Sequence, residues 1–283
     1  MTGLPVFFYA TMRLGAKLLA DTLLRIRDFE KYGVYAGFSG RHGGLSKDAF
    51  SSLNIGLHVG DENQVVLHNR QVIAHDLGIS DMQVTYAEQI HGTDVAVIDE
   101  LHVGRGHASL QSAVQGVDAM VTKVNHAALA IVAADCVPLL FADLRHPVIG
   151  AAHAGWRGAT GGIVTKTVET MLACGASLSS LYVAMGPAIR GCCYEVDEPV
   201  ISQYKAAYHR IGKKPQWQPS TKHSHRVMID LPTLLNDQLI SLGITQNRIL
   251  DTAICTHCMD GYYSYRKENG TTGRHGGFIA LRR

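Results

Sequence analysis

Two apolar runs of strand length, residues 128–134 and 147–152, most strongly restrict what this chain can fold into. Polar residues hardly interrupt them, which is typical of strands buried on both faces, and we expect the two to pair with each other. The first ends at Asp135-Cys136, and the second delivers His153 into the glycine-flanked segment AAHAGWRG. Side chains at strand ends are held rigidly and face a cleft, so these positions predict a functional site.

The rest of the pattern predicts mixed secondary structure. Strands are expected at 33–39, 83–90, 93–98, 117–122, 181–185, 226–230, 248–253 and 276–281. Helices are expected at 65–77, closed by Gly78, and at about 161–173, 197–208 and 232–242. The polar, proline-containing residues 209–225 are predicted to form a long loop. Because the order is not a regular βαβ alternation, the fold class is predicted to be α+β.

Residues 1–32 are expected to form an amphipathic extension. Leucines recur there at helical spacing, and Arg13, Lys17 and Asp21 interrupt the apolar patch before it reaches a membrane-spanning length. The charges follow the apolar region instead of preceding it, unlike a signal peptide. We therefore predict a packed or partner-binding helix.

The composition limits the class of protein. With 46% hydrophobic and 18% charged residues, the chain of 283 residues is globular and can bury a sizeable core. A net charge of +2 is too balanced to predict a nucleic-acid partner. Six cysteines in so long a chain do not resemble a secreted disulfide framework, which predicts reduced thiols and a cytoplasmic location.

Three residues at predicted strand ends form a candidate metal site: His91, Cys136 and His153. A thiolate and two imidazoles suit Zn²⁺, and three protein ligands leave the fourth tetrahedral position open, as in catalytic sites. A competing interpretation makes Cys136 a nucleophile with His153 as its base. Asp135 is poorly placed to orient that base, because adjacent strand residues face opposite ways, and this favours the metal.

The other cysteine motifs predict no chemistry. Cys255 and Cys258 form a C-x-x-C pair, but an aromatic, strand-like run follows it in place of the helix that a redox pair requires. A zinc site would need a second pair, and the adjacent Cys192 and Cys193 have the wrong spacing. Structural free thiols are expected.

Arginine-bearing turns predict anion binding. The pentapeptide GRHGG occurs at 40–44 and 273–277, and Arg157 lies in GWRG at the start of a predicted helix. Backbone N–H groups and a guanidinium together suit phosphate. Glu88, three residues before His91, is a candidate proton carrier if a turn or bulge brings the two to one side.

The chain resembles the YfiH/laccase-domain family from about residue 33 to its end. The segments that match are FSGRHGG, SLNIGLHVGD, EQIHGTDV, AADCVPLLFAD, AAHAGWRG, MGPAI and YYSYRKENGTTGR. The resemblance implies residues 1–32 as an extension of unknown role and 33–283 as one catalytic α+β domain, with mixed β-sheets flanked by helices. It implies zinc, one per chain, on His91, Cys136 and His153, and phosphate or substrate contacts from Arg41, Asn54, Arg70 and Arg274. Glu88, Asp135 and Arg157 complete the catalytic candidates.

This family, once labelled multicopper polyphenol oxidases, implies a zinc-dependent purine nucleoside phosphorylase with adenosine deaminase activity. Adenosine, inosine, guanosine and methylthioadenosine are the expected substrates. The alternatives are a zinc- or cysteine-dependent amidohydrolase, a polyphenol oxidase, and a non-enzymatic partner protein that uses the N-terminal helix. Electron relay between copper ions needs repeated H-x-H pairs. The one H-x-H pair of this sequence, residues 223–225, lies in a predicted polar loop. Copper bound by His91, Cys136 and His153 would therefore be adventitious. The partners expected are small molecules, with no membrane span, and homo-oligomerisation stays open.

Overall fold

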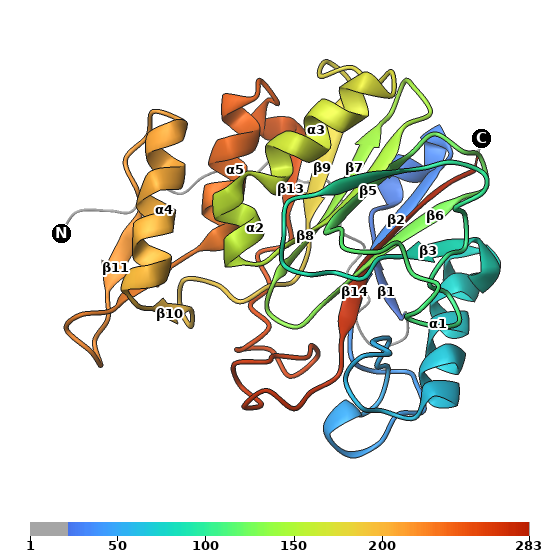
Figure 1. Cartoon of the computed structure of the whole chain (residues 1–283), viewed down its shortest axis with the longest axis horizontal. Helices are drawn as coiled ribbons and strands as arrows, with labels where there is room; N and C mark the ends of the chain where they lie inside the picture. Colours follow the sequence, from blue (N-terminus) through green and yellow to red (C-terminus); the bar gives the residue numbers. More distant parts are fainter. Residues whose placement is uncertain (1–21, 283) are drawn as a thin grey trace.

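The computed structural model describes residues 22–282, which form two large mixed sheets packed face to face, with helices on the outer sides (Figure 1). The five-stranded sheet has the order β1-β2-β14-β6-β3. Its strands are Leu23–Arg25, Val34–Ser39, His275–Leu281, Ala128–Ala133 and Val84–Tyr86. The six-stranded sheet has the order β13-β9-β7-β8-β5-β4. Its strands are Ile249–Asp251, Leu181–Met185, Val137–Asp143, Ile149–Ala154, Ala119–Thr122 and Val95–Ile98.

Smaller elements complete the chain. A three-stranded sheet, β10-β12-β11, joins Glu195–Val196, Val227–Ile229 and Trp217–Pro219. The α-helices are α1 (Asn63–Leu77), α2 (Trp156–Gly161), α3 (Ile163–Ala173), α4 (Glu198–Arg210) and α5 (Leu231–Ser241). Short 3₁₀ turns occur at Arg27–Tyr32, Asp48–Phe50, Asp81–Gln83 and Gln246–Arg248. The predicted α+β class is confirmed.

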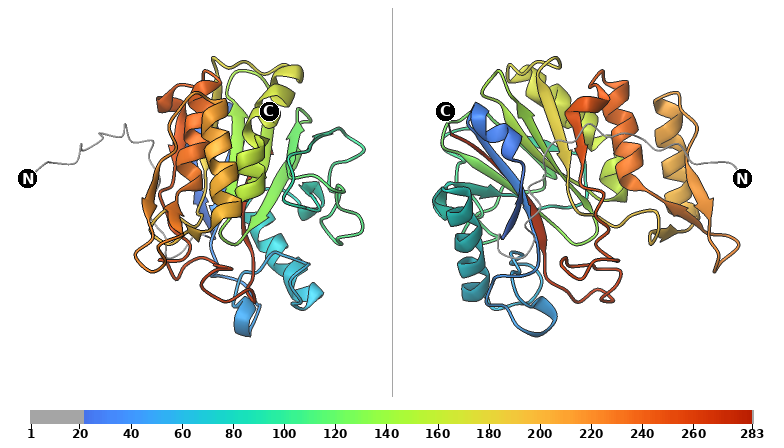
Figure 2. Two further views of the ribbon diagram at one scale, coloured as in Figure 1. Left: turned by 60° about the vertical axis from the view of Figure 1, so that its left-hand side comes forward. Right: turned by 180° about the vertical axis from the view of Figure 1, so that it is seen from behind.

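Strands buried on both faces explain the long apolar runs. In β6, Leu129 and Ile131 pack between the two large sheets, whereas Ala128 and Ala130 face the side that carries α1. In β7 and β8 the same alternation sends one face toward the other sheet and the other face toward α2–α5. Helix α1 and helices α2–α5 therefore cover opposite sides of the molecule, as both views in Figure 2 show. Because successive side chains of a strand point to opposite faces, both faces must be apolar.

Most predicted elements are confirmed to within a few residues, but several details were wrong. The runs 128–134 and 147–152 do not pair with each other, because they lie in different sheets: β6 belongs to the five-stranded sheet, whereas β8 pairs with β7 and β5 in the six-stranded sheet. The helix expected at about 161–173 begins at Ile163, after α2, because Gly162 adopts a left-handed conformation with φ 91°. The loop expected at 209–225 contains the end of α4 and strand β11.

The N-terminal helix prediction was wrong where it can be compared. Leu23 and Leu24 lie in β1, which pairs antiparallel with β2, because backbone pairing at this sheet edge outweighs the helical spacing. The earlier part of that predicted helix lies outside the described residues. Among residues 22–282, no helix is both long enough and apolar enough to cross a membrane.

Candidate metal centre and cavity

His91 and Cys136 lie in the two segments that lead from the five-stranded sheet to the six-stranded sheet. The segment after β3 leads to β4 and carries His91; the segment after β6 leads to β7 and carries Cys136. Each crossing contains a non-glycine residue in the left-handed region, His91 at φ 62° and Asp135 at φ 88°. Such conformations cost free energy and cluster at functional sites.

His153 joins these two residues from the end of β8. Strands β7 and β8 pair with Pro138 opposite His153, so the imidazole lies beside the turn that carries Cys136. One ligand atom from each of His91, Cys136 and His153 lies within 4.8 Å of the others. The imidazole rings of the two histidines meet edge to face with centroids 4.8 Å apart. The fold therefore brings together the trio that the sequence predicts.

A buried carboxylate orients the two histidines. Asp118 Oδ1 lies 2.8 Å from His153 Nδ1, and both residues are almost completely buried. The same carboxylate accepts the backbone N–H groups of Ile90, His91 and Gly92, at 2.6–3.1 Å. Because Nδ1 of His153 is occupied, Nε2 is the nitrogen available to a metal, in the arrangement that metal-binding histidines usually show.

Gly155 allows the backbone to approach the trio closely. A Cβ atom at this position would lie 2.9 Å from His91 Cδ2 and 3.0 Å from Cys136 Sγ. Real Cβ contacts are longer, so any other residue would displace one of the two ligands. The absence of a side chain at Gly155 therefore allows His91 and Cys136 to keep their positions.

Electrostatics favour the thiolate form of Cys136, which is the form that binds metals. Burial alone would raise the pKa of the Cys136 thiol, but the charge and hydrogen bonds of His153 and His91 outweigh it and lower the pKa to about 6. Burial likewise acts to lower the pKa of His153, but Cys136 and Asp118 raise it to about 9. These opposite shifts favour a thiolate beside an imidazolium when no metal is bound, and a divalent cation that replaces the imidazolium proton would suit this sulfur and nitrogen donor set. The residues present therefore fit a zinc ion.

The trio opens into a cavity of about 690 Å³ at one end of the two-sheet core. Its aromatic walls are the side chains of Trp156, Tyr194 and Tyr265. Three cations, Arg157, Arg266 and Arg274, also line it, together with His58, Glu88 and Asp135. A volume of this size lies within the range of small-molecule sites.

The arginines are held against aromatic rings. The guanidinium of Arg157 lies 4.2 Å from the centroid of Trp156, and that of Arg266 lies 5.2 Å from Tyr194. Arg274 lies 5.8 Å from the Tyr265 ring and donates to the carbonyl oxygens of Thr272 and Gly273. Stacking and hydrogen bonding limit the conformations of these cations before any anion arrives.

Four predicted site residues make hydrogen bonds or ion pairs within the protein, and their roles toward substrate stay predictions. Arg41, Arg70 and Asn54 are absent from the cavity lining. Arg41 forms an ion pair with Glu268 at 2.9 Å. Arg70 is buried and donates hydrogen bonds to the carbonyl oxygens of Ile55, Gly106 and His107. Asn54 is fully buried, and its side-chain oxygen accepts a hydrogen bond from the backbone N–H of Arg274. Asp135 lines the cavity, but its carboxylate accepts Thr256 Oγ1 at 2.6 Å and the Arg266 N–H at 2.7 Å, so it positions the wall.

Glu88 and Arg157 do reach the cavity. Glu88 follows Ala87, which forms an isolated bridge with Val114, and its exposed side chain lies in the same lining as His91. Strand β3 ends at Tyr86, so Glu88 does not lie in a regular strand, and its role in proton transfer stays a prediction.

Several residues of the site carried no signal that the sequence analysis used. Asp118 is separated from His153 by 35 residues, and only the fold joins them. Gln89 exchanges two hydrogen bonds with the backbone of Val132, at 2.8 and 2.9 Å, and so ties the crossing that carries His91 to β6. His58 lies in the lining, where desolvation and the charges of Arg274 and Arg70 lower its pKa to about 4, leaving it neutral near pH 7.

Comparison with known proteins decides the family. The family model described as "Multi-copper polyphenol oxidoreductase laccase" matches residues 35–282. The chain belongs to this laccase-like family. It is 36% identical over 257 residues to the purine nucleoside phosphorylase YlmD of Geobacillus stearothermophilus, covering 88% of this chain and 91% of that relative.

Two further members of the laccase-like family bear on this chain. The adenosine deaminase RL5 of an unknown prokaryote is 32% identical over 229 residues, which cover 81% of this chain and 86% of RL5. The crystal structure of the protein YfiH from Bacillus licheniformis superposes with a TM-score of 0.85 at 31% identity, covering 94% of this chain and 98% of that one. The resemblance read from the sequence is confirmed.

Proposed function

We propose that this protein is a purine nucleoside phosphorylase that also deaminates adenosine, with zinc held by His91, Cys136 and His153. The single observation that carries the proposal is the composition of the cavity. One chamber contains a three-ligand metal centre, three arginines and three aromatic walls. The names of the relatives YlmD and RL5, a phosphorylase and a deaminase, support the same pair of reactions.

The arginines would hold the attacking phosphate. In phosphorolysis a phosphate oxygen forms a bond to C1′ of the ribose while the bond from C1′ to the base breaks, and the base leaves with the electron pair and takes up a proton. Arg157, Arg266 and Arg274 supply charge-assisted donors on the cavity wall. Glu88 is the carboxyl group we assign to proton transfer, because it lines the same cavity.

The aromatic walls would hold the purine. Trp156, Tyr194 and Tyr265 line the cavity, and aromatic rings suit stacking on a base. Neutral His58 adds a ring nitrogen that can donate to or accept from a nucleoside hydroxyl.

Deamination would use the metal centre. When bound, Zn²⁺ with three protein ligands supplies a Lewis acid that activates water near neutral pH. Asp118 holds His153 through its Nδ1 atom, and the cavity lining would position the edge of the base near the trio.

Product analysis tests the proposal. Purified protein is incubated with adenosine, with and without phosphate, and the products are separated. We expect adenine and ribose 1-phosphate to form only with phosphate, and inosine to form without it. Cys136→Ser should lose the zinc of the trio and the deamination, whereas Cys174→Ser, which changes a cysteine outside the trio and the cavity lining, should keep both. Failure of the wild-type protein to produce either set of products would refute the proposal.

One observation favours a second function. The lowered pKa of Cys136 and its contact with His153 are the features of an activated nucleophile, so a cysteine-dependent amidohydrolase is the alternative. In that case activity would persist in metal-free protein, and iodoacetamide would abolish it through alkylation of Cys136.

Polyphenol oxidation has less support. The described residues hold two groups of His, Cys, Asp or Glu with metal-ligand spacing, and neither contains the histidine set of a multicopper relay. Oxygen uptake with a phenolic substrate checks this alternative directly.

A further inference from the structure

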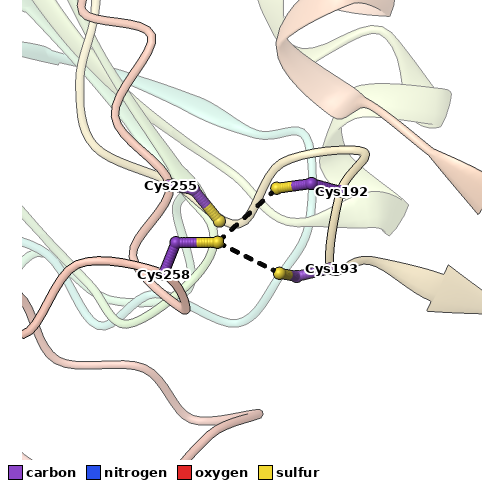
Figure 3. A group of neighbouring side chains, drawn as sticks. All are labelled: Cys192, Cys193, Cys255 and Cys258. Atoms are coloured by element: carbon purple, nitrogen blue, oxygen red, sulfur yellow. Dashed lines mark hydrogen bonds between the residues drawn. The ribbon is translucent and has the colours of Figure 1, made fainter.

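Four cysteines that are distant in the sequence converge at a second place in the fold. Cys192 and Cys193 lie in the segment between β9 and β10, and Cys255 and Cys258 lie after β13. Their four sulfur atoms all lie within 4.8 Å of one another, and Figure 3 shows them pointing toward a common centre. The sequence analysis set Cys192-Cys193 aside because of its spacing, but the fold places this pair beside the C-x-x-C pair.

The distances fit a tetrahedral thiolate site. With Zn–S bonds of about 2.3 Å, adjacent sulfurs of a tetrahedron lie roughly 3.8 Å apart. Cys258 Sγ lies 3.7 Å from Cys192 Sγ and 3.3 Å from Cys193 Sγ. All six cysteines are free of disulfide bonds, so every sulfur of the cluster is available as a ligand.

The backbone around the cluster is arranged for a metal-binding turn. The Met259 N–H donates to the Cys255 carbonyl oxygen at 3.1 Å, which closes the turn of the C-x-x-C pair. Residues Ala188 and Cys255 form a parallel bridge that sets the two segments side by side.

We infer that Cys192, Cys193, Cys255 and Cys258 bind a structural Zn²⁺ that is separate from the cavity site. Four protein ligands close the coordination shell, which is the arrangement of structural and not catalytic zinc. Four thiolates select a soft cation, and oxygen-preferring cations such as Mg²⁺ or Ca²⁺ do not suit them.

The cysteine cluster lies between two segments that form part of the cavity wall. The segment with Cys192 and Cys193 also carries Ile189 and Tyr194, and the segment with Cys258 continues to Tyr265 and Arg266; all four of these flanking residues line the cavity. A metal that joins the two segments would fasten two parts of the cavity wall to each other. Its loss should therefore loosen the wall that presents Arg266 and Tyr194.

Metal counting in the full chain, purified under reducing conditions, tests this inference. Cys258→Ser and Cys192→Ser should each contain one zinc per chain fewer than the wild-type protein, whereas Cys174→Ser should match the wild type. The readout is the difference between variants, so it does not depend on whether the trio in the cavity holds zinc. Cys136→Ser provides that separate comparison and should lose its own equivalent independently. Equal zinc in wild-type and Cys258→Ser protein would overturn the inference.

Thiol alkylation of the wild-type protein keeps the inference testable if a variant fails to fold. The four cysteines should resist iodoacetamide until a chelator is added, and no reductant should be needed to expose them. Immediate alkylation of all four without chelator would show that no metal is bound. If the cysteines became reactive toward iodoacetamide only after a reductant was added, they would be joined in a disulfide. Either of these two results would contradict the zinc site.

Discussion

The Nδ1 atom of His153 lies 2.8 Å from Oδ1 of Asp118, and both side chains are sealed from solvent. This contact decides which ring nitrogen of His153 faces Cys136. Because the same carboxylate receives three backbone N–H groups of the segment that carries His91, it fixes two members of the trio at once. The geometry of the candidate metal centre therefore depends on Asp118, a residue outside the trio.

Replacing Asp118 should weaken the metal centre. Asp118→Asn removes the charge that orients His153, and loss of such a supporting carboxylate typically lowers metal affinity about 10- to 100-fold. Competition of the purified variant against a zinc chelator measures the change. Unaltered affinity would mean that Asp118 is dispensable for orienting the ligands.

Gly155 offers a steric test of the same centre. Gly155→Ala places a methyl group 2.9 Å from His91 Cδ2 and 3.0 Å from Cys136 Sγ, so zinc affinity should fall as one ligand is displaced. Gly261→Ala is the matched control, because a Cβ there meets no atom within 4 Å. Equal zinc affinity in the two variants would contradict the geometry of the trio.

Asp143 should make the free energy of unfolding depend on pH in the acidic range. Burial would raise the pKa of this carboxyl, but the backbone N–H groups of His146, Ser177 and Arg145 and the Ser180 side chain lower it to about 2. A lowered pKa stabilises the folded state above the ordinary value of the group, and this stability is lost as the pH falls from about 4 toward 2.

Asp143→Asn should therefore lower the free energy of unfolding by about 1–2 kcal/mol near neutral pH, and the difference from wild type should shrink in acid. Urea unfolding at several pH values measures both, with the exposed Glu100→Gln as control. A difference that stays constant over this pH range would argue against the depressed pKa.

The sequence predicted those parts of the site that lie at strand ends. His91, Cys136 and His153 are recognisable because each interrupts an apolar run at a turn, and that pattern is local. Asp118 and Gln89 have no such signal, since their partners lie 35 and 43 residues away. The four-cysteine cluster was missed for the same reason: 66 residues separate Cys192 from Cys258.

Identical local sequence led to different roles for two arginines. Arg41 and Arg274 occupy the same position of the pentapeptide GRHGG, yet Glu268 pairs with Arg41, whereas Arg274 lines the cavity. A turn motif predicts donors that suit an anion, but tertiary contacts decide whether an anion can reach them. The pairing of strands could not be predicted in the same way, because the apolar sequences of β6 and β8 do not determine which strands lie beside them.

The most direct test of the shared cavity compares Arg274→Ala with Arg41→Ala on adenosine, with and without phosphate. Removing one charge-assisted contact to the transition state costs about 2–4 kcal/mol, so phosphorolysis by Arg274→Ala should fall roughly 30- to 1000-fold. Deamination by Arg274→Ala should fall far less, since water replaces phosphate in that reaction. In Arg41→Ala, both reactions should fall less than phosphorolysis falls in Arg274→Ala. Equal losses of phosphorolysis and deamination in Arg274→Ala would contradict the assignment of phosphate to this arginine and, with it, the proposed division of the cavity.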